Sequence, residues 1–145
     1  MAWSNILKNM ADLRFKPLEH PSDIGIIAFG KNPKEIFENA GFGLFSLIGD
    51  LSNVEGKEHF LIKIEGDDQE ALLVNWLNEL LFYYDTKSVL LKAFKIKKLS
   101  NKQLEAEVKG EKIDLDKHTV YKSVKAATYN QLQISKNKAT IVFDV

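Results

Sequence analysis

Two aspartates near opposite ends of the chain are the residues best suited to bind a metal ion. Asp23 lies in the segment EHPSDIG, just before a stretch rich in Ile and Phe, and Asp144 is followed directly by the terminal carboxylate of Val145. Carboxylates held close together repel one another unless a positive charge lies between them. If the first and last strands are neighbours, these three groups would converge on one point. Without that pairing, Asp23 would simply cap a turn and Asp144 would be part of a solvated terminus.

Oxygen donors without a thiolate favour Ca²⁺ or Mg²⁺ over zinc. Other chemistries find less support in the sequence. The chain has no cysteine, which excludes thiol catalysis and disulfides, and it has neither a phosphate-binding glycine loop nor a serine in a nucleophile elbow. His59 is expected at the surface of a strand, and His118 is expected to be a turn residue in a polar loop rather than a ligand.

The segment NPKEIFENAGFGLFSLIGD carries the signals of a helix. Asn32 suits the N-cap, Pro33 suits the first helical position, and Gly49 suits the end of the helix. Gly41 and Gly43 lie inside this helix, where glycine is unfavourable by about 1 kcal/mol relative to alanine. They predict that the helix approaches a neighbouring element closely.

The segment from Asp67 to Asp85 is the strongest helix prediction in the chain. Its apolar residues recur at helical spacing and form one broad stripe, and its first turn is acidic, as the helix dipole favours. Asn75, Asn78 and Glu79 lie off that stripe. The apolar stripe consists of Leu72, Leu73, Trp76, Leu77, Leu80, Leu81 and Tyr84.

The remaining segments read as strands, with turns at residues 100–101 and 136–138. Helices that alternate with the first strands and precede a run of strands predict an α+β fold, a two-layer sandwich in which two main helices pack on a mostly antiparallel β-sheet. The expected strands cover residues 20–30, 57–66, 89–99, 102–110, 122–135 and 138–145.

With 145 residues and no net charge, the chain is expected to form one domain, preceded by a partly ordered leader at residues 1–14. It has no recognisable signal peptide or membrane span, so a cytoplasmic protein is expected. A monomer is expected as well. Residues 18–85 contain thirteen acidic residues and four lysines, whereas residues 86–126 contain eleven lysines and five acidic residues. The lysine-rich half is either a solvated strand face or a positive surface for RNA or an acidic partner.

Four segments resemble one known family in order and spacing. They are EHPSDIGIIAFG, LLVNWLNELLFYYD, VKAATYNQLQI and the terminal IVFDV. Together they are similar to the archeases, and the resemblance extends from about Phe15 to Val145. It implies a domain at residues 15–145 that contains the strand-helix-strand-strand (SHS2) module.

The resemblance also implies a function. Archeases are accessory proteins, with a chaperone-like role, of the RtcB-type tRNA-splicing ligase, which joins RNA ends using GTP and Mn²⁺. They promote guanylylation of the ligase's active-site histidine and so restore multiple turnover. Carried over by position, Asp23, Asp144 and Val145 match the family's metal site and Lys125 matches a lysine with an activation role. Contact with GTP or tRNA is expected only through the ligase.

The leading hypothesis is therefore a non-enzymatic ligase activator that holds a divalent cation, either Ca²⁺ or Mg²⁺/Mn²⁺. One alternative is a metal-dependent phosphohydrolase that uses the same carboxylates, although no general base or nucleophile is evident beside them. Another alternative is a plain protein-interaction module in which the acidic terminus is structural. For Lys125 the competing interpretation is a solvated strand lysine.

Overall fold

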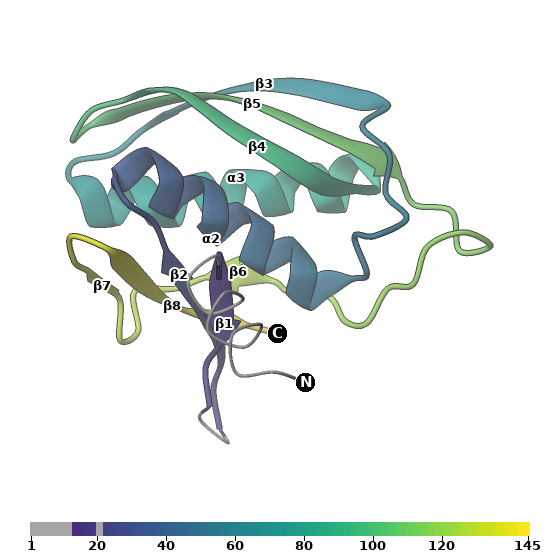
Figure 1. Cartoon of the computed structure of the whole chain (residues 1–145), viewed down its shortest axis with the longest axis horizontal. Helices are drawn as coiled ribbons and strands as arrows, with labels where there is room; N and C mark the ends of the chain where they lie inside the picture. Colours follow the sequence, from purple (N-terminus) through teal and green to yellow (C-terminus); the bar gives the residue numbers. More distant parts are fainter. Residues whose placement is uncertain (1–12, 20–21) are drawn as a thin grey trace, which may run out of the picture.

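The computed structural model describes residues 13–19 and 22–145, and these residues form two helices that lie between two antiparallel sheets (Figure 1). The α+β class predicted from the sequence is confirmed, with the strands divided between two sheets. The expected leader falls mostly on residues 1–12, which lie outside the described residues. The elements are β1 (Phe15–Pro17), β2 (Ile24–Phe29), α2 (Pro33–Ile48), β3 (Glu58–Glu65), α3 (Gln69–Lys87), β4 (Val89–Leu99), β5 (Gln103–Lys112), β6 (Ala126–Ala127), β7 (Gln133–Ile134) and β8 (Lys138–Asp144).

The two sheets differ in how far apart their strands lie in the sequence. The three-stranded sheet has the order β3-β5-β4, and all of its strands come from residues 58–112. The five-stranded sheet has the order β1-β2-β8-β6, with β7 also pairing with β8. The second sheet therefore joins the beginning of the described chain to its end, and this pairing positions the candidate site.

Helix α2 forms where its capping residues predict it. The Asn32 side chain accepts a hydrogen bond from the backbone N–H of Glu35 at 2.9 Å, and Pro33 occupies the first turn. A Cβ atom added at Gly41 would lie 2.8 Å from a ring carbon of Phe94 on β4. Glycine is therefore required there because the helix lies directly on the three-stranded sheet. This confirms the close approach predicted from the sequence.

Helix α3 confirms the predicted stripe and supplies Trp76, the largest fully buried side chain among the described residues. Asp68 caps the helix by accepting from the backbone N–H of Ala71 at 2.8 Å. Trp76 is fully buried between the sheets, and its indole N–H donates to the backbone oxygen of Phe37 on α2 at 2.9 Å. This bond ties the two helices together at the centre of the core.

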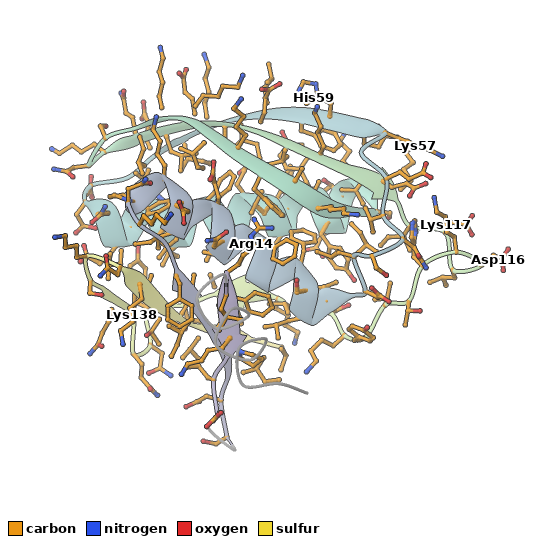
Figure 2. The ribbon with its side chains drawn as sticks, viewed as in Figure 1. Arg14, Lys57, His59, Asp116, Lys117 and Lys138 are labelled. Atoms are coloured by element: carbon orange, nitrogen blue, oxygen red, sulfur yellow. The ribbon has the colours of Figure 1, made fainter. Side chains whose placement is uncertain are left out.

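The outer face of the three-stranded sheet carries much of the lysine-rich region (Figure 2). Here Glu105 lies within 3.5 Å of both Lys63 and Lys98, and Glu107 pairs with Lys97 at 2.5 Å and with His59 at 2.6 Å. Exposed ion pairs of this kind each contribute about 0–1 kcal/mol to stability. This arrangement favours the interpretation of a solvated strand face. His59 is exposed, as predicted.

Three details differ from the predicted strands. Strand β1 was not predicted, and it pairs with β2 through registers such as Phe15↔Ala28. Among the described residues of the segment predicted as a strand at 20–30, the strand is β2, Ile24–Phe29. The single strand predicted at 122–135 is wrong, because the chain forms only β6 and β7 there and turns between them. The turn is closed by a hydrogen bond from the N–H of Leu132 to the backbone oxygen of Tyr129 at 3.2 Å and by one from the N–H of Asn130 to the Thr128 hydroxyl at 3.3 Å. Gln131, within this turn, adopts a left-handed conformation with φ 56°.

Candidate functional site

The strands that carry the two aspartates are direct neighbours in the five-stranded sheet. Strands β2 and β8 run antiparallel, and Ile24 pairs with Phe143 at the end of the ladder. Asp23 and Asp144 each lie one residue beyond this pair, so the register places them opposite each other. Residues that face each other across an antiparallel pair have Cα atoms about 5 Å apart. The beginning and the end of the domain therefore meet where both carboxylates lie.

Both aspartates belong to the face of the sheet that points away from the helices. Ile26 and its partner Ile141 are fully buried against the core, and successive residues of a strand alternate between faces. Asp23 and Asp144 are each three positions away from that pair, which assigns them to the opposite face. Asp144 is exposed and Asp23 is half-buried. The carboxylates are therefore accessible at the edge of the molecule rather than locked in the core.

Lys125 is held at the same end of the sheet by its backbone. Its N–H donates to the backbone oxygen of Asp144 at 2.8 Å, and the next residue, Ala126, pairs with Asp144 in the register of β6 and β8. The sequence placed Lys125 within a strand, whereas it lies just before β6. Its side chain is exposed, while that of Val124 is buried. The main chain therefore brings Lys125 next to Asp144.

Gln131 is a further site residue that the sequence did not reveal. Its side-chain N–H donates to a carboxylate oxygen of Asp23 at 3.1 Å, across 108 positions of sequence. The left-handed backbone of Gln131 is unfavourable for a residue with a side chain by about 1–2 kcal/mol. No glycine or periodic pattern marks this position in the sequence. Its contact with Asp23 orients one carboxylate of the candidate site.

The donors at this sheet end fit a hard cation by their chemistry. They are the side-chain carboxylates of Asp23 and Asp144, the terminal carboxylate of Val145 and the side-chain amide of Gln131, all of which offer oxygen atoms. Within residues 13–19 and 22–145, no three His, Asp or Glu side chains gather as a group that could hold a metal ion. The metal site predicted at Asp23, Asp144 and Val145 therefore stays a prediction.

His118 lies in the loop after β5, as expected, but its ring is buried rather than exposed. Its Nδ1 accepts a hydrogen bond from the backbone N–H of Asp114 at 3.0 Å, so the proton lies on Nε2, which is 3.0 Å from the Glu111 carboxylate. Glu111 also accepts from Lys117 at 3.0 Å and from the backbone N–H of Glu55 at 2.9 Å. Figure 2 shows Lys117 and Asp116 in this loop, which extends from one end of the molecule.

This cluster explains a dependence of stability on pH. The backbone N–H of Glu55 and the ammonium group of Lys117 lower the pKa of Glu111 from 4.5 to about 2, with a smaller effect from His118. A pKa lowered by folding contributes stability that is fully present above the unfolded value and is lost as the pH falls toward the folded value. We expect the free energy of unfolding to fall between pH 4.5 and about pH 2 through this group.

The Glu111→Gln variant tests this expectation in urea unfolding at several pH values. At neutral pH the variant should be less stable than the wild type, because the charged hydrogen bonds of the cluster are lost. The difference in free energy of unfolding between the wild type and the variant should narrow as the pH falls below 4.5. Glu65→Gln, on the exposed side of β3, serves as the control. If the stability difference between the wild type and Glu111→Gln stays constant from pH 7 to pH 3, folding does not lower the pKa of Glu111 as described.

No helix in the part of the chain that the structure describes is long and apolar enough to cross a membrane.

Comparisons with known proteins place these features in a family. The model of the Archease protein family (MTH1598/TM1083) matches residues 15–145. The chain is 41% identical over 138 residues to the protein archease of Sulfurisphaera tokodaii, covering 91% of this chain and 99% of that protein. It is 39% identical over 130 residues to the protein archease of Sulfolobus acidocaldarius, covering 89% and 94%.

Solved structures agree with the sequence comparisons. The solution structure of protein 1598 from Methanobacterium thermoautotrophicum superposes with a TM-score of 0.76 at 33% identity, covering 91% of this chain and 99% of that chain. The crystal structure of an archease and possible chaperone from Thermotoga maritima has a TM-score of 0.56 at 21% identity, covering 90% and 96%, and so shows the shared fold. On the extent of the family match and the identity to its relatives, this chain belongs to the archease family.

Proposed function

We propose that this protein is an accessory activator of an RtcB-type tRNA-splicing RNA ligase, promoting guanylylation of the ligase and its multiple turnover. Membership of the archease family supports the accessory role. The observation that carries the proposal is the pairing of β2 with β8, which brings Asp23, Asp144 and the terminal Val145 to one exposed edge. The proposed setting is the cytoplasm, where a monomer meets the ligase and encounters GTP and tRNA only through it.

Asp23, Asp144 and Val145 would hold one divalent cation, either Ca²⁺ or Mg²⁺/Mn²⁺. Such an ion, when bound, offsets the repulsion among the carboxylates and supplies positive charge toward a triphosphate. The chain's own residues supply the positioning: β2 and β8 bring the two side chains together, and Gln131 donates to one oxygen of Asp23. This arrangement of side chains exists before any partner binds, so the site residues need to move little on contact with the ligase.

We infer that the protein performs no turnover of its own. Acid–base catalysis needs a proton-transfer group within hydrogen-bond reach of the reacting atoms. Of the two histidines that the structure describes, His59 pairs with Glu107 on the other sheet and His118 is engaged by Asp114 and Glu111. Neither is positioned beside Asp23 and Asp144. The site offers binding and charge, which suits an activator acting on a ligase.

The direct test adds this protein to its cognate RNA ligase with GTP and Mn²⁺ and measures both guanylylated ligase and joined RNA at multiple turnover. We expect substoichiometric amounts to stimulate both products. Ligase that is already guanylylated should complete its first round of joining without the activator. Stimulation confined to that first round would contradict the proposal. Hydrolysis of GTP or RNA by this protein alone would instead favour the metal-dependent phosphohydrolase.

Lys125 should contribute to activation without contributing to folding. Its backbone N–H forms the bond to Asp144, so replacing its exposed side chain leaves that bond in place. We expect Lys125→Met to lower the stimulated guanylylation rate about tenfold, because one charge-assisted contact with a phosphate or carboxylate is removed. Unfolding in urea should be unchanged to within about 0.5 kcal/mol, as for other surface substitutions. Equal losses of activation and of stability would make Lys125 a structural residue.

A further inference from the structure

Asn78 on α3 lies off the apolar stripe of its helix, yet its side chain makes two hydrogen bonds to one residue of the five-stranded sheet. Its side-chain oxygen accepts from the backbone N–H of Ala127 at 2.8 Å, and its amide nitrogen donates to the backbone oxygen of Ala127 at 3.4 Å. A carboxamide offers a donor and an acceptor side by side, as the edge of a β-strand does. Asn78 therefore takes the place of a neighbouring strand beside β6.

Strand β6 needs such support because it consists of two residues. On its inner side it pairs with β8, through the bond from Lys125 N–H to the Asp144 oxygen and the bond from Thr128 N–H to the Val142 oxygen at 3.1 Å. The N–H and C=O of Ala127 turn the other way, toward α3, where Asn78 satisfies both. When a buried or half-buried backbone N–H or C=O loses its hydrogen-bond partner, the folded state is destabilised. On the edge that faces α3, the position of β6 thus depends on the side chain of Asn78.

We propose that Asn78 is a positioning residue of the candidate site, one that fixes Lys125 and Asp144 through β6. Lys125 lies two residues before Ala127, and its N–H is bonded to Asp144. Gln131, which donates to Asp23, lies four residues after Ala127. The residues on both sides of the site, Lys125 and Gln131, are therefore within four positions of Ala127, the residue that Asn78 holds. This inference rests on the proposed function for its effects on metal binding and on the ligase, whereas its effect on hydrogen exchange is independent of that function.

The same helix supplies a matched control. Asn75 lies nearly one turn before Asn78, and its side-chain nitrogen donates to the backbone oxygen of Glu65, at the end of β3, at 2.9 Å. It is therefore the same residue type on the same helix, and it also bonds to a main-chain group, but that group belongs to the three-stranded sheet. Asn75→Ala removes a bond of similar kind without touching β6. A general effect of weakening α3 would appear in both variants.

The first measurement is amide hydrogen exchange on the protein without added metal. In Asn78→Ala, the amides of Lys125 and Ala127 should exchange about tenfold faster, because Ala127 loses both hydrogen bonds to Asn78 and β6 is held less firmly. The amides of β3, β4 and β5 should keep their wild-type rates. Asn75→Ala should leave Lys125 and Ala127 unchanged. Unaltered exchange at both amides in Asn78→Ala would show that the Asn78 side chain does not hold β6 in place.

The second measurement is Mn²⁺ binding by isothermal titration. Asn78→Ala should weaken the affinity about tenfold, the lower end of the effect of losing a group that orients metal ligands, whereas Asn75→Ala should not. Asn78→Asp keeps the acceptor for the Ala127 N–H but loses the donor, so it should fall between the wild type and Asn78→Ala. It also serves as the informative variant if Asn78→Ala folds poorly. Wild-type Mn²⁺ affinity in both Asn78 variants would overturn the positioning role.

Ligase stimulation separates the two proposals. If Asp144→Asn abolishes stimulation while both Asn78 variants stimulate normally, the role of Asn78 is wrong and the proposed function stands. If Asp144→Asn stimulates normally, the proposed function is wrong, and the exchange and Mn²⁺ measurements alone decide whether Asn78 positions the site.

Discussion

Replacing Asp144 with asparagine is expected to abolish stimulation of the cognate ligase while the protein stays folded. The side chain keeps its size, but one of the three carboxylates at the β2–β8 edge loses its charge. Loss of a group that merely orients a metal ligand weakens metal binding about 10- to 100-fold, and loss of a ligand itself should do at least as much. Asp23→Asn should have the same effect, since Asp23 faces Asp144 in the register. The measurement is the rate of ligase guanylylation at multiple turnover.

Asp116→Asn is the matched control for these variants. Asp116 is an exposed aspartate in the loop after β5, and the five-stranded sheet does not include it. This variant should stimulate the ligase as the wild type does, and all three variants should show wild-type circular dichroism. Retained stimulation by both Asp23→Asn and Asp144→Asn would mean that these carboxylates do not take part in activation.

Replacing Trp76 with alanine is expected to lower the free energy of unfolding by about 3–5 kcal/mol. Trp76 is fully buried, and its ring packs edge-on against Phe94 with centroids 6.5 Å apart. The substitution leaves a cavity between the helices and the three-stranded sheet and removes the hydrogen bond to the backbone oxygen of Phe37. A loss of this size is a large part of the total stability of a small domain. Urea unfolding followed by circular dichroism measures it.

Trp76→Phe separates the cavity from the hydrogen bond. Phenylalanine keeps an aromatic ring but has no N–H to donate, so the loss should be smaller, about 1–3 kcal/mol. If Trp76→Ala lost less than about 1 kcal/mol, the core would not depend on this side chain in the way that its burial indicates.

Local signals in the sequence were sufficient to predict the two helices. Asn32 and Asp68 cap them, and the apolar stripe of α3 is buried as its spacing predicts, except at the half-buried Tyr84. Such signals are contained within a few consecutive residues and need no knowledge of the rest of the fold. Gly41 was also informative, because a glycine inside a helix needs a reason and the ring of Phe94 supplies it.

Long-range arrangement was harder to predict. The division of the strands into two sheets depends on which strand pairs with which, and β-strand periodicity describes the faces of a strand but not its partner. Strand β1 is three residues long and carries no periodic pattern. The segment around β6 resembles a strand by composition, but the hydrogen bond from Leu132 to Tyr129 and the left-handed backbone of Gln131 turn the chain after Thr128.

The candidate site was predicted only in part, for the same reason. Asp23 and Asp144 were singled out by their chemistry, and the expectation that the first and last strands lie together supplied their proximity. Gln131 and Asn78 act through single side-chain hydrogen bonds that span 108 and 49 positions of the sequence. Bonds of this kind have no local pattern, so only the three-dimensional structure reveals them.

The central claim is that the paired ends of β2 and β8 bind one divalent cation through Asp23 and Asp144. Titration of the purified protein with Mn²⁺ and with Ca²⁺ tests it most directly, using the wild type and the Asp23→Asn/Asp144→Asn double variant. We predict one bound ion per chain in the wild type and no measurable binding in the double variant. Binding of the same stoichiometry and affinity in both proteins would contradict the claim.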